Sequence, residues 1–174
     1  MVHIYTGDGK GKTTAALGLA MRAIGHGFKV FMVQFLKNSD IMGEPYGEIK
    51  VLNKFQGALT IKSFGKGGWI KRGQTTQEDK NLVSRATKTA KSAIKDPSYK
   101  LVILDEIFLA HYFELLSIEE ILEIIDSKPI EKELVLTGRN APQEIIGRAD
   151  LVTEMRSIKH YYDKGVKARK GIEF

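Results

Sequence analysis

The sequence contains no cysteine among its 174 residues, and it has only four prolines and one tryptophan. The absence of cysteine excludes disulfide bonds and metal sites built from thiolates. No apolar run approaches the length of a membrane span, and no signal peptide precedes the first apolar segment. We therefore expect a cytoplasmic protein without a membrane partner.

The remaining composition is that of an ordinary globular domain. Hydrophobic residues make up 43% of the chain and charged residues 28%. The length predicts one domain over residues 1–174, large enough for a sizeable core. The 27 Lys and Arg outnumber the 21 Asp and Glu, which gives a net charge of +6. This excess favours anionic ligands such as nucleotides and leaves nucleic acid open as a less favoured partner.

The most informative stretch of the chain is Thr6-Gly7-Asp8-Gly9-Lys10-Gly11-Lys12-Thr13-Thr14. It follows a short segment with strand character and precedes a segment whose apolar residues recur with the period of a helix. A strand, a glycine-rich turn and a helix form the context of a phosphate-binding loop, in which backbone N–H groups face an anion. We therefore predict that residues 6–14 bind the phosphates of a nucleotide. Lys12 would neutralise phosphate charge, and the Thr13 hydroxyl would ligate Mg²⁺.

The loop departs from the general pattern G-x-x-x-x-G-K-[ST] at its first position. Thr6 stands where the first glycine is expected, and Gly7 and Gly9 lie inside the loop instead. The alternative is a glycine-rich turn without a ligand, but the Gly-Lys-Thr-Thr end and both flanking segments match the pattern. The departure predicts a triphosphate that is held in an unusual way.

An acidic pair predicts the second half of such a site. The apolar segment 101–104 runs directly into Asp105 and Glu106. A carboxylate at the carboxyl end of a strand can hold Mg²⁺ or its water shell near the phosphates, so we predict a metal site made of Thr13, Asp105 and Glu106. A solvated aspartate is the alternative, and the glycine-rich loop argues against it. Glu106 also allows an ATPase in which it activates water.

Apolar and amphipathic segments alternate along the chain, which predicts an α/β protein with a mainly parallel, doubly wound sheet. The expected strands are residues 3–5, 29–35, 59–64, 101–104, 133–137 and 150–155. The expected helices are residues 15–24, 77–95, 108–116, 118–127 and 142–148. Patterns that resemble capping boxes at Thr76 and Ser117 begin two of these helices. Residues 36–58 are expected to be irregular.

Three further residues are candidates for ligand contacts. Trp69 lies in a basic, glycine-rich loop, where it is either an anchor of the loop or a flat surface for a planar ligand. Arg139 follows the strand at 133–137, beyond the sheet edge where ligands of open α/β sheets bind; a structural ion pair is the alternative. His160 belongs to a basic, aromatic tail that is either a binding segment or a solvated terminus.

The chain resembles the P-loop-type ATP:cob(I)alamin (corrinoid) adenosyltransferases from residue 2 to residue 174. In that family Thr commonly stands at the first loop position, so the departure noted above supports the resemblance. The segments that carry it are Thr6-Gly-Asp-Gly-Lys-Gly-Lys-Thr-Thr-Ala-Ala-Leu-Gly, Arg22-Ala-Ile-Gly-His-Gly, Val33-Gln-Phe-Leu-Lys, Val102-Ile-Leu-Asp-Glu, Leu134-Val-Leu-Thr-Gly-Arg, Ala149-Asp-Leu-Val-Thr-Glu-Met and Lys159-His-Tyr-Tyr-Asp-Lys-Gly-Val-Lys-Ala-Arg-Lys-Gly-Ile-Glu.

The resemblance implies a RecA-like sheet with strand order 3-2-4-5-1-6, in a homodimer. It implies transfer of the 5′-deoxyadenosyl group of ATP to the cobalt of a reduced corrinoid, with release of triphosphate, in adenosylcobalamin biosynthesis or salvage. Co(I) is itself the nucleophile, so the protein aligns the reactants and stabilises the leaving group. ATP binds in the reverse of the usual P-loop orientation. Lys12, the loop amides and Mg²⁺ would face the triphosphate, and a reduced flavoprotein is a compatible electron donor.

Two departures from the family bear on the corrinoid. The family's aromatic loop often reads G-x-G-F-x-W and helps to remove the lower axial ligand of Co(II). Here Gly68 stands at the Phe position and Trp69 lies one place early. The sequence also begins at its first strand, without the N-terminal extension of many relatives. A RecA-like ATPase, a P-loop phosphotransferase and a nucleotide-binding module remain as alternatives.

Overall fold

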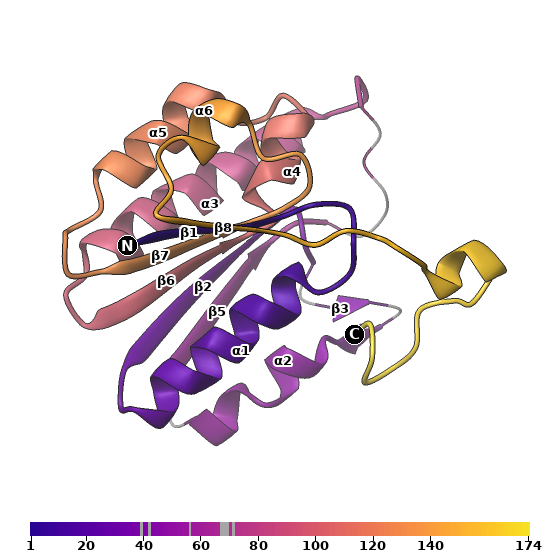
Figure 1. Cartoon of the computed structure of the whole chain (residues 1–174), viewed down its shortest axis with the longest axis horizontal. Helices are drawn as coiled ribbons and strands as arrows, with labels where there is room; N and C mark the ends of the chain where they lie inside the picture. Colours follow the sequence, from indigo (N-terminus) through magenta and orange to yellow (C-terminus); the bar gives the residue numbers. More distant parts are fainter. Residues whose placement is uncertain (39, 42, 56, 67–69, 71) are drawn as a thin grey trace.

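The computed structural model describes residues 1–38, 40–41, 43–55, 57–66, 70 and 72–174. Its centre is one six-stranded sheet with helices on both faces (Figure 1). The strands are β1 (Val2–Thr6), β2 (Lys29–Phe35), β5 (Leu59–Phe64), β6 (Tyr99–Asp105), β7 (Glu133–Thr137) and β8 (Leu151–Glu154). Their order is β5-β2-β6-β7-β1-β8, and every neighbouring pair is parallel. This confirms the order 3-2-4-5-1-6 that the resemblance implied.

Different helices cover the two faces of the six-stranded sheet. On one face lie α1 (Lys12–Gly25), α2 (Gly47–Lys50) and η1 (Leu52–Phe55). On the other lie α3 (Gln77–Lys95), α4 (Ile107–Tyr112), α5 (Ile118–Asp126) and α6 (Gln143–Ile146). The capping boxes at Thr76 and Ser117 are both formed, so these two helix starts are confirmed. The last turn, η2 (Tyr161–Lys164), belongs to the tail.

The expectation of an irregular segment at residues 36–58 was wrong in part. This segment contains α2, η1 and a small antiparallel hairpin of β3 (Asp40–Ile41) and β4 (Glu44–Pro45). Each of these elements has only two or four residues. Such short elements contain too few residues for a helical or strand periodicity to be recognised.

The core forms two layers, one on each face of the sheet. Ile4, Leu104 and Phe108 belong to the larger layer under α3, α4 and α5, whereas Ala16 and Ile103 belong to the smaller layer under α1. Neighbouring residues of β6 therefore point to opposite faces, as the pleat requires. Because both faces are covered, β2 is buried at every position after its first, which explains its nearly continuous apolar sequence.

The topology places the carboxyl ends of all six strands along one edge of the sheet. The glycine-rich loop, Asp105 and Thr137 follow or end neighbouring strands there. Over the part of the chain that the structure describes, no helix combines the length and the apolar character that crossing a membrane requires. The fold thus brings the predicted site residues to the edge where ligands of parallel sheets bind.

Candidate nucleotide-binding site

The glycine-rich loop packs directly against the end of β8. Gly7 has a φ of 97°, and a Cβ atom added there would lie 2.4 Å from the carbonyl oxygen of Met155. At Gly9 the same oxygen would be 2.7 Å from an added Cβ, and it accepts the Gly9 N–H at 2.7 Å. Only glycine fits this close approach at both positions.

Thr6 has a structural role that explains the departure at the first loop position. It ends β1 and is buried, and its Oγ1 accepts the backbone N–H of Ala141 at 3.2 Å. This bond joins the start of the loop to the segment after β7. A glycine would lack the hydroxyl group that makes this connection.

Lys12, the first residue of α1, lies within the loop rather than in solvent. Its Nζ donates to the carbonyl oxygens of Gly7 and Gly9, both at 2.7 Å, and the residue is 7% exposed. Burial lowers the pKa of Lys12, and the nearby Glu106 carboxylate acts in the opposite direction. The ammonium group is therefore already held in the loop where a phosphate would bind.

Asp105 is the centre of a hydrogen-bond network beneath the loop. Its side chain is fully buried. Oδ1 accepts from the hydroxyl groups of Thr13 at 2.9 Å and Thr137 at 2.7 Å, and Oδ2 accepts from Lys37 Nζ at 2.7 Å. Burial alone would lower the pKa of Lys37, but the charge of Asp105 and its hydrogen bond raise the pKa above its ordinary value. The pair is therefore an ion pair.

Glu106 turns its side chain into the cleft through an unusual backbone conformation. Its φ is 60°, in the left-handed region, and its N–H donates to Thr137 Oγ1 at 3.0 Å. Burial and then the neighbouring Asp105 raise the pKa of Glu106, while Lys37 and Lys12 oppose this shift. A cation bound beside Glu106 would favour its charged form.

The oxygen atoms of Thr13, Asp105 and Glu106 fit a hard cation such as Mg²⁺. Within the described ranges, no three His, Asp or Glu side chains gather into a set that could hold a metal by themselves. Two carboxylates and a hydroxyl at the mouth of a phosphate-binding loop instead suit a metal that is shared with phosphate oxygens. The donor set therefore fits the predicted metal.

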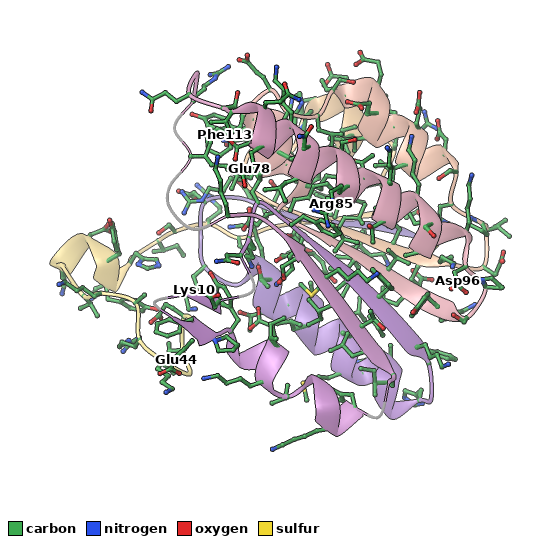
Figure 2. All side chains as sticks on the ribbon, turned by 180° about the vertical axis from the view of Figure 1, so that it is seen from behind. Lys10, Glu44, Glu78, Arg85, Asp96 and Phe113 are labelled. Carbon is green, nitrogen blue, oxygen red and sulfur yellow. The ribbon has the colours of Figure 1, made fainter. Side chains whose placement is uncertain are left out.

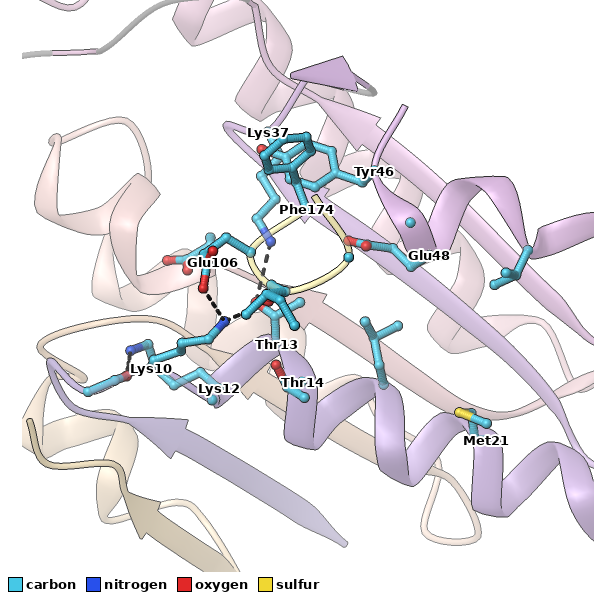
Figure 3. A pocket seen from close by; sticks show the side chains of 18 of the residues that line it. Lys10, Lys12, Thr13, Thr14, Met21, Lys37, Tyr46, Glu48, Glu106 and Phe174 are labelled. Carbon is cyan, nitrogen blue, oxygen red and sulfur yellow. Dashed lines mark hydrogen bonds and ion pairs between the residues drawn. The ribbon is translucent and has the colours of Figure 1, made fainter. Parts of the chain in front are cut away.

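These groups lie at one end of a cleft with a volume of about 610 Å³ (Figure 3). Its polar end is formed by the loop, Lys37, Glu106 and Arg139. Its other walls contain apolar side chains of α1 and of the segment 51–59, together with Tyr46 and His160. The predicted contacts Arg139 and His160 thus meet at the same cleft, whereas Trp69 lies outside the described residues. A cleft of this size can accommodate one small ligand.

The chain's tail returns across this cleft. Gly171, Ile172, Glu173 and Phe174 line it, and Lys10 Nζ of the loop donates to the carbonyl oxygen of Ile172 at 2.9 Å. Figure 2 shows Lys10 and Glu44 beside the returning tail, where Lys170 forms an ion pair with Glu44 at 2.7 Å. The His160 ring accepts the N–H of Tyr162 at its Nδ1 atom and lies 4.6 Å from the Tyr161 ring. The tail therefore forms part of the site.

Sequence reasoning missed three parts of this arrangement as site residues: Lys37, Thr137 and residues 172–174, which follow the tail segment 159–171 that was a candidate for binding. Lys37 follows the predicted strand 29–35, so it lies at the same sheet edge as Asp105. The rule that parallel strands meet their ligands at their carboxyl ends could have identified it. No comparable signal in the sequence places residues 172–174 beside Lys10.

The fold and this site define a P-loop, RecA-like α/β protein. A flagellar accessory protein, FlaH from Methanocaldococcus jannaschii, shares the fold with a TM-score of 0.53 and 13% identity; the match covers 88% of this chain and 69% of FlaH. At this identity the likeness concerns the fold alone.

Sequence comparison identifies the family. The family ATP:corrinoid adenosyltransferase BtuR/CobO/CobP matches residues 1–174. The chain is 35% identical over 174 residues to the corrinoid adenosyltransferase of Escherichia coli (strain K12), covering 100% of this chain and 85% of the relative. It is 36% identical over 171 residues to that of Pseudomonas aeruginosa, covering 98% and 82%. The chain therefore belongs to the ATP:corrinoid adenosyltransferase family, and it transfers the adenosyl group of ATP to a corrinoid.

Proposed function

We propose that this enzyme transfers the 5′-deoxyadenosyl group of ATP to the cobalt of a reduced corrinoid and releases triphosphate from the loop of residues 6–14. The observation that carries the proposal is the convergence of Lys12, Thr13 and Glu106 at the polar end of one cleft. The full-length family match supplies the two substrates. The cleft has room for ATP, whereas the larger corrinoid must approach from its open side.

The chemistry requires little of the protein's side chains. The Co(I) electron pair forms the bond to the 5′ carbon, and the bond from that carbon to the triphosphate oxygen breaks, with its electrons leaving on triphosphate. No proton is transferred, so no general base is needed. The protein contributes alignment of the two substrates and stabilisation of the charge on the leaving group. Lys12 and the loop N–H groups would supply this stabilisation.

Thr13, Asp105 and Glu106 would hold Mg²⁺ at this site, directly or through water. When bound, Mg²⁺ neutralises charge on the triphosphate oxygens. Two features support the assignment: the oxygen donors converge beside the loop, and the pKa of Glu106 is raised in the surroundings formed by the protein alone. A divalent cation would remove the repulsion between the two neighbouring carboxylates.

The remaining assignments follow from the family and from the cleft. Arg139 is exposed at the cleft and would meet an anionic group, and His160 and Trp69 would contact the corrinoid. We further propose a single domain over residues 1–174, a homodimer in the cytoplasm, and a reduced flavoprotein as electron donor. Size-exclusion chromatography with light scattering tests the dimer.

Product analysis with Mg-ATP and chemically reduced corrinoid tests the reaction. We expect triphosphate and a photolabile cobalt–carbon product in equal amounts. ADP as a product would support either alternative enzyme: a phosphotransferase if no inorganic phosphate accompanies it, and an ATPase that uses Glu106 to activate water if inorganic phosphate does. Binding of ATP without any product would leave a binding module.

A further inference from the structure

Lys37 places its ammonium group against two of the oxygens that the proposed magnesium site uses. Its Nζ lies 2.7 Å from Asp105 Oδ2 and 3.3 Å from Thr13 Oγ1. Figure 3 shows the side chain extending from beyond β2 toward Thr13. The ammonium group therefore lies where a cation bound by Thr13 and Asp105 would lie.

The Asp105 carboxylate depends on that positive charge. It is fully buried, and the two hydroxyl groups that donate to Oδ1 are uncharged. A buried carboxylate without a cationic partner is strongly unfavourable. Among the described side chains that hydrogen-bond to Asp105, Lys37 is the cationic one, so either its ammonium group or a metal ion must balance the carboxylate by direct contact.

Lys37 and a metal ion cannot share this position. The Thr13 hydroxyl donates to Asp105 and accepts from Lys37, so one of its two lone pairs already faces the ammonium group. Mg²⁺ bound to both this hydroxyl oxygen and Asp105 would lie about 2.1 Å from each of them, in the space that Nζ now occupies. A divalent ion at this distance would also repel the ammonium group strongly.

The displaced side chain has a clear alternative place. Lys37 lines the cleft, and its side chain is 21% exposed beside the ring of Tyr46, whose centroid lies 5.9 Å from Nζ. The lysine stem is flexible, so rotation about its bonds moves Nζ from Asp105 into the cleft. A triphosphate held by the loop would present negative charge there.

We propose that Lys37 and Mg²⁺ exchange on Asp105: Lys37 balances the buried carboxylate until Mg²⁺ binds, and it then turns into the cleft to contact the triphosphate. This inference rests on the proposed magnesium site. Lys37 then stabilises the leaving group together with Lys12, but only after the metal has bound. Metal binding and triphosphate binding consequently reinforce each other.

Electron paramagnetic resonance of Mn²⁺ added to the nucleotide-free protein tests whether Lys37 and the metal compete for Asp105. Lys37→Met removes the competing charge and should tighten Mn²⁺ binding about tenfold. Lys37→Arg pairs with carboxylate through two hydrogen bonds and should weaken Mn²⁺ binding below the wild-type level. Lys10→Met is the matched control, since Lys10 lines the same cleft and donates to Ile172 instead of Asp105. An equal gain in the control, or no gain in Lys37→Met, overturns the exchange.

Calorimetry with tripolyphosphate tests where Lys37 goes. Lys37→Met should weaken binding about tenfold with Mg²⁺ present and less than about twofold in EDTA. Equal losses under both conditions would make Lys37 a permanent phosphate contact, and no loss under either would keep it on Asp105; both results overturn the exchange.

These assays need no corrinoid. If neither the wild type nor any variant binds Mn²⁺, with or without tripolyphosphate, the magnesium site itself is wrong, whereas Mn²⁺ binding that does not change on substitution of Lys37 refutes only this inference.

Discussion

At the scale of single residues, Lys12 is the side chain that the leaving group needs most. It is held by two loop carbonyls, so its charge is positioned before ATP arrives. We expect Lys12→Ala to raise the activation free energy by about 3 kcal/mol, which is typical of one preorganised contact. This increase lowers kcat roughly a hundredfold. Steady-state rates at saturating ATP measure the loss. A near-normal kcat would contradict this role, and Lys10→Ala serves as the control for the loss of one loop charge.

Glu106 should make stability depend on pH. Burial and the neighbouring Asp105 raise its pKa above the ordinary value of 4.5. The folded protein therefore binds the proton of the Glu106 carboxyl group more tightly than the unfolded chain does. The stabilisation of the folded state by this proton is complete below the ordinary pKa and is lost as the pH rises through the pKa in the folded protein. We expect Glu106→Gln to increase the free energy of unfolding at neutral pH, and to lose this advantage as the pH falls from the raised pKa of Glu106 towards about 4.5, below which none remains. Urea unfolding at several pH values, without metal, measures the difference. A pH-independent gain would refute the assignment to this carboxyl.

The same substitution tests the metal site. Glu106→Gln removes one of the proposed carboxylate ligands and should raise the Mg²⁺ concentration at half-maximal rate by about tenfold. A magnesium titration of the adenosyl transfer rate provides the measurement. Intact Mg²⁺ affinity combined with a loss of ATP hydrolysis would instead favour the ATPase alternative.

At the scale of elements, the contact between the loop and β8 fixes the shape of the phosphate site. Gly9→Ala places a Cβ atom 2.7 Å from the Met155 carbonyl oxygen, so the backbone must shift. We expect this change to destabilise the protein by about 1–3 kcal/mol and to abolish ATP binding. Gly18→Ala is the matched control within α1, because among the described residues no atom beyond the neighbouring backbone of its own helix lies within 4 Å of its added Cβ. It should stabilise the protein by about 0.5–1 kcal/mol. Thermal unfolding and ATP calorimetry test both, and normal ATP binding by Gly9→Ala would contradict the close approach.

The strands of the main sheet and the starts of two helices could be predicted from the sequence, whereas the strand order could not be predicted from the residue pattern alone. The residue pattern identified the six strands of the main sheet, because β2 and β6 are long and apolar, and it identified the starts of α3 and α5 from their caps. Their order in the sheet came from the family resemblance. Periodicity shows that a segment is a strand but not which strand it pairs with.

The network around Asp105 could not be predicted because it depends on register. The parallel pairing of Leu104 with Leu136 places Asp105 beside Thr137, so one hydroxyl can join Asp105 to the backbone of Glu106. A shift of one residue would point Thr137 to the other face of the sheet. The position of the tail likewise depends on ion pairs between distant segments, such as Lys170 and Glu44.

At the scale of the whole molecule, the tail of residues 159–174 belongs to the site but not to the core. None of its residues is buried, and the core lies between the sheet and its helices. Its contacts with the remainder include Lys10 with Ile172 and Lys170 with Glu44, which are exposed polar interactions. Exposed ion pairs of this kind add little to stability.

Deletion of residues 159–174 should therefore separate folding from substrate binding. We expect the free energy of unfolding to change by less than about 1 kcal/mol, because no buried apolar side chain is lost. The KM for ATP should rise by about tenfold, because residues 171–174 form one wall of the cleft and His160 is lost with them.

Lys170→Ala, which removes only the pair with Glu44, is the control and should change this KM less than about twofold. Urea unfolding and initial rates over a range of ATP concentrations give the two quantities. Loss of cooperative unfolding would place the tail within the folded core, and an unchanged KM would show that the cleft binds ATP without this wall.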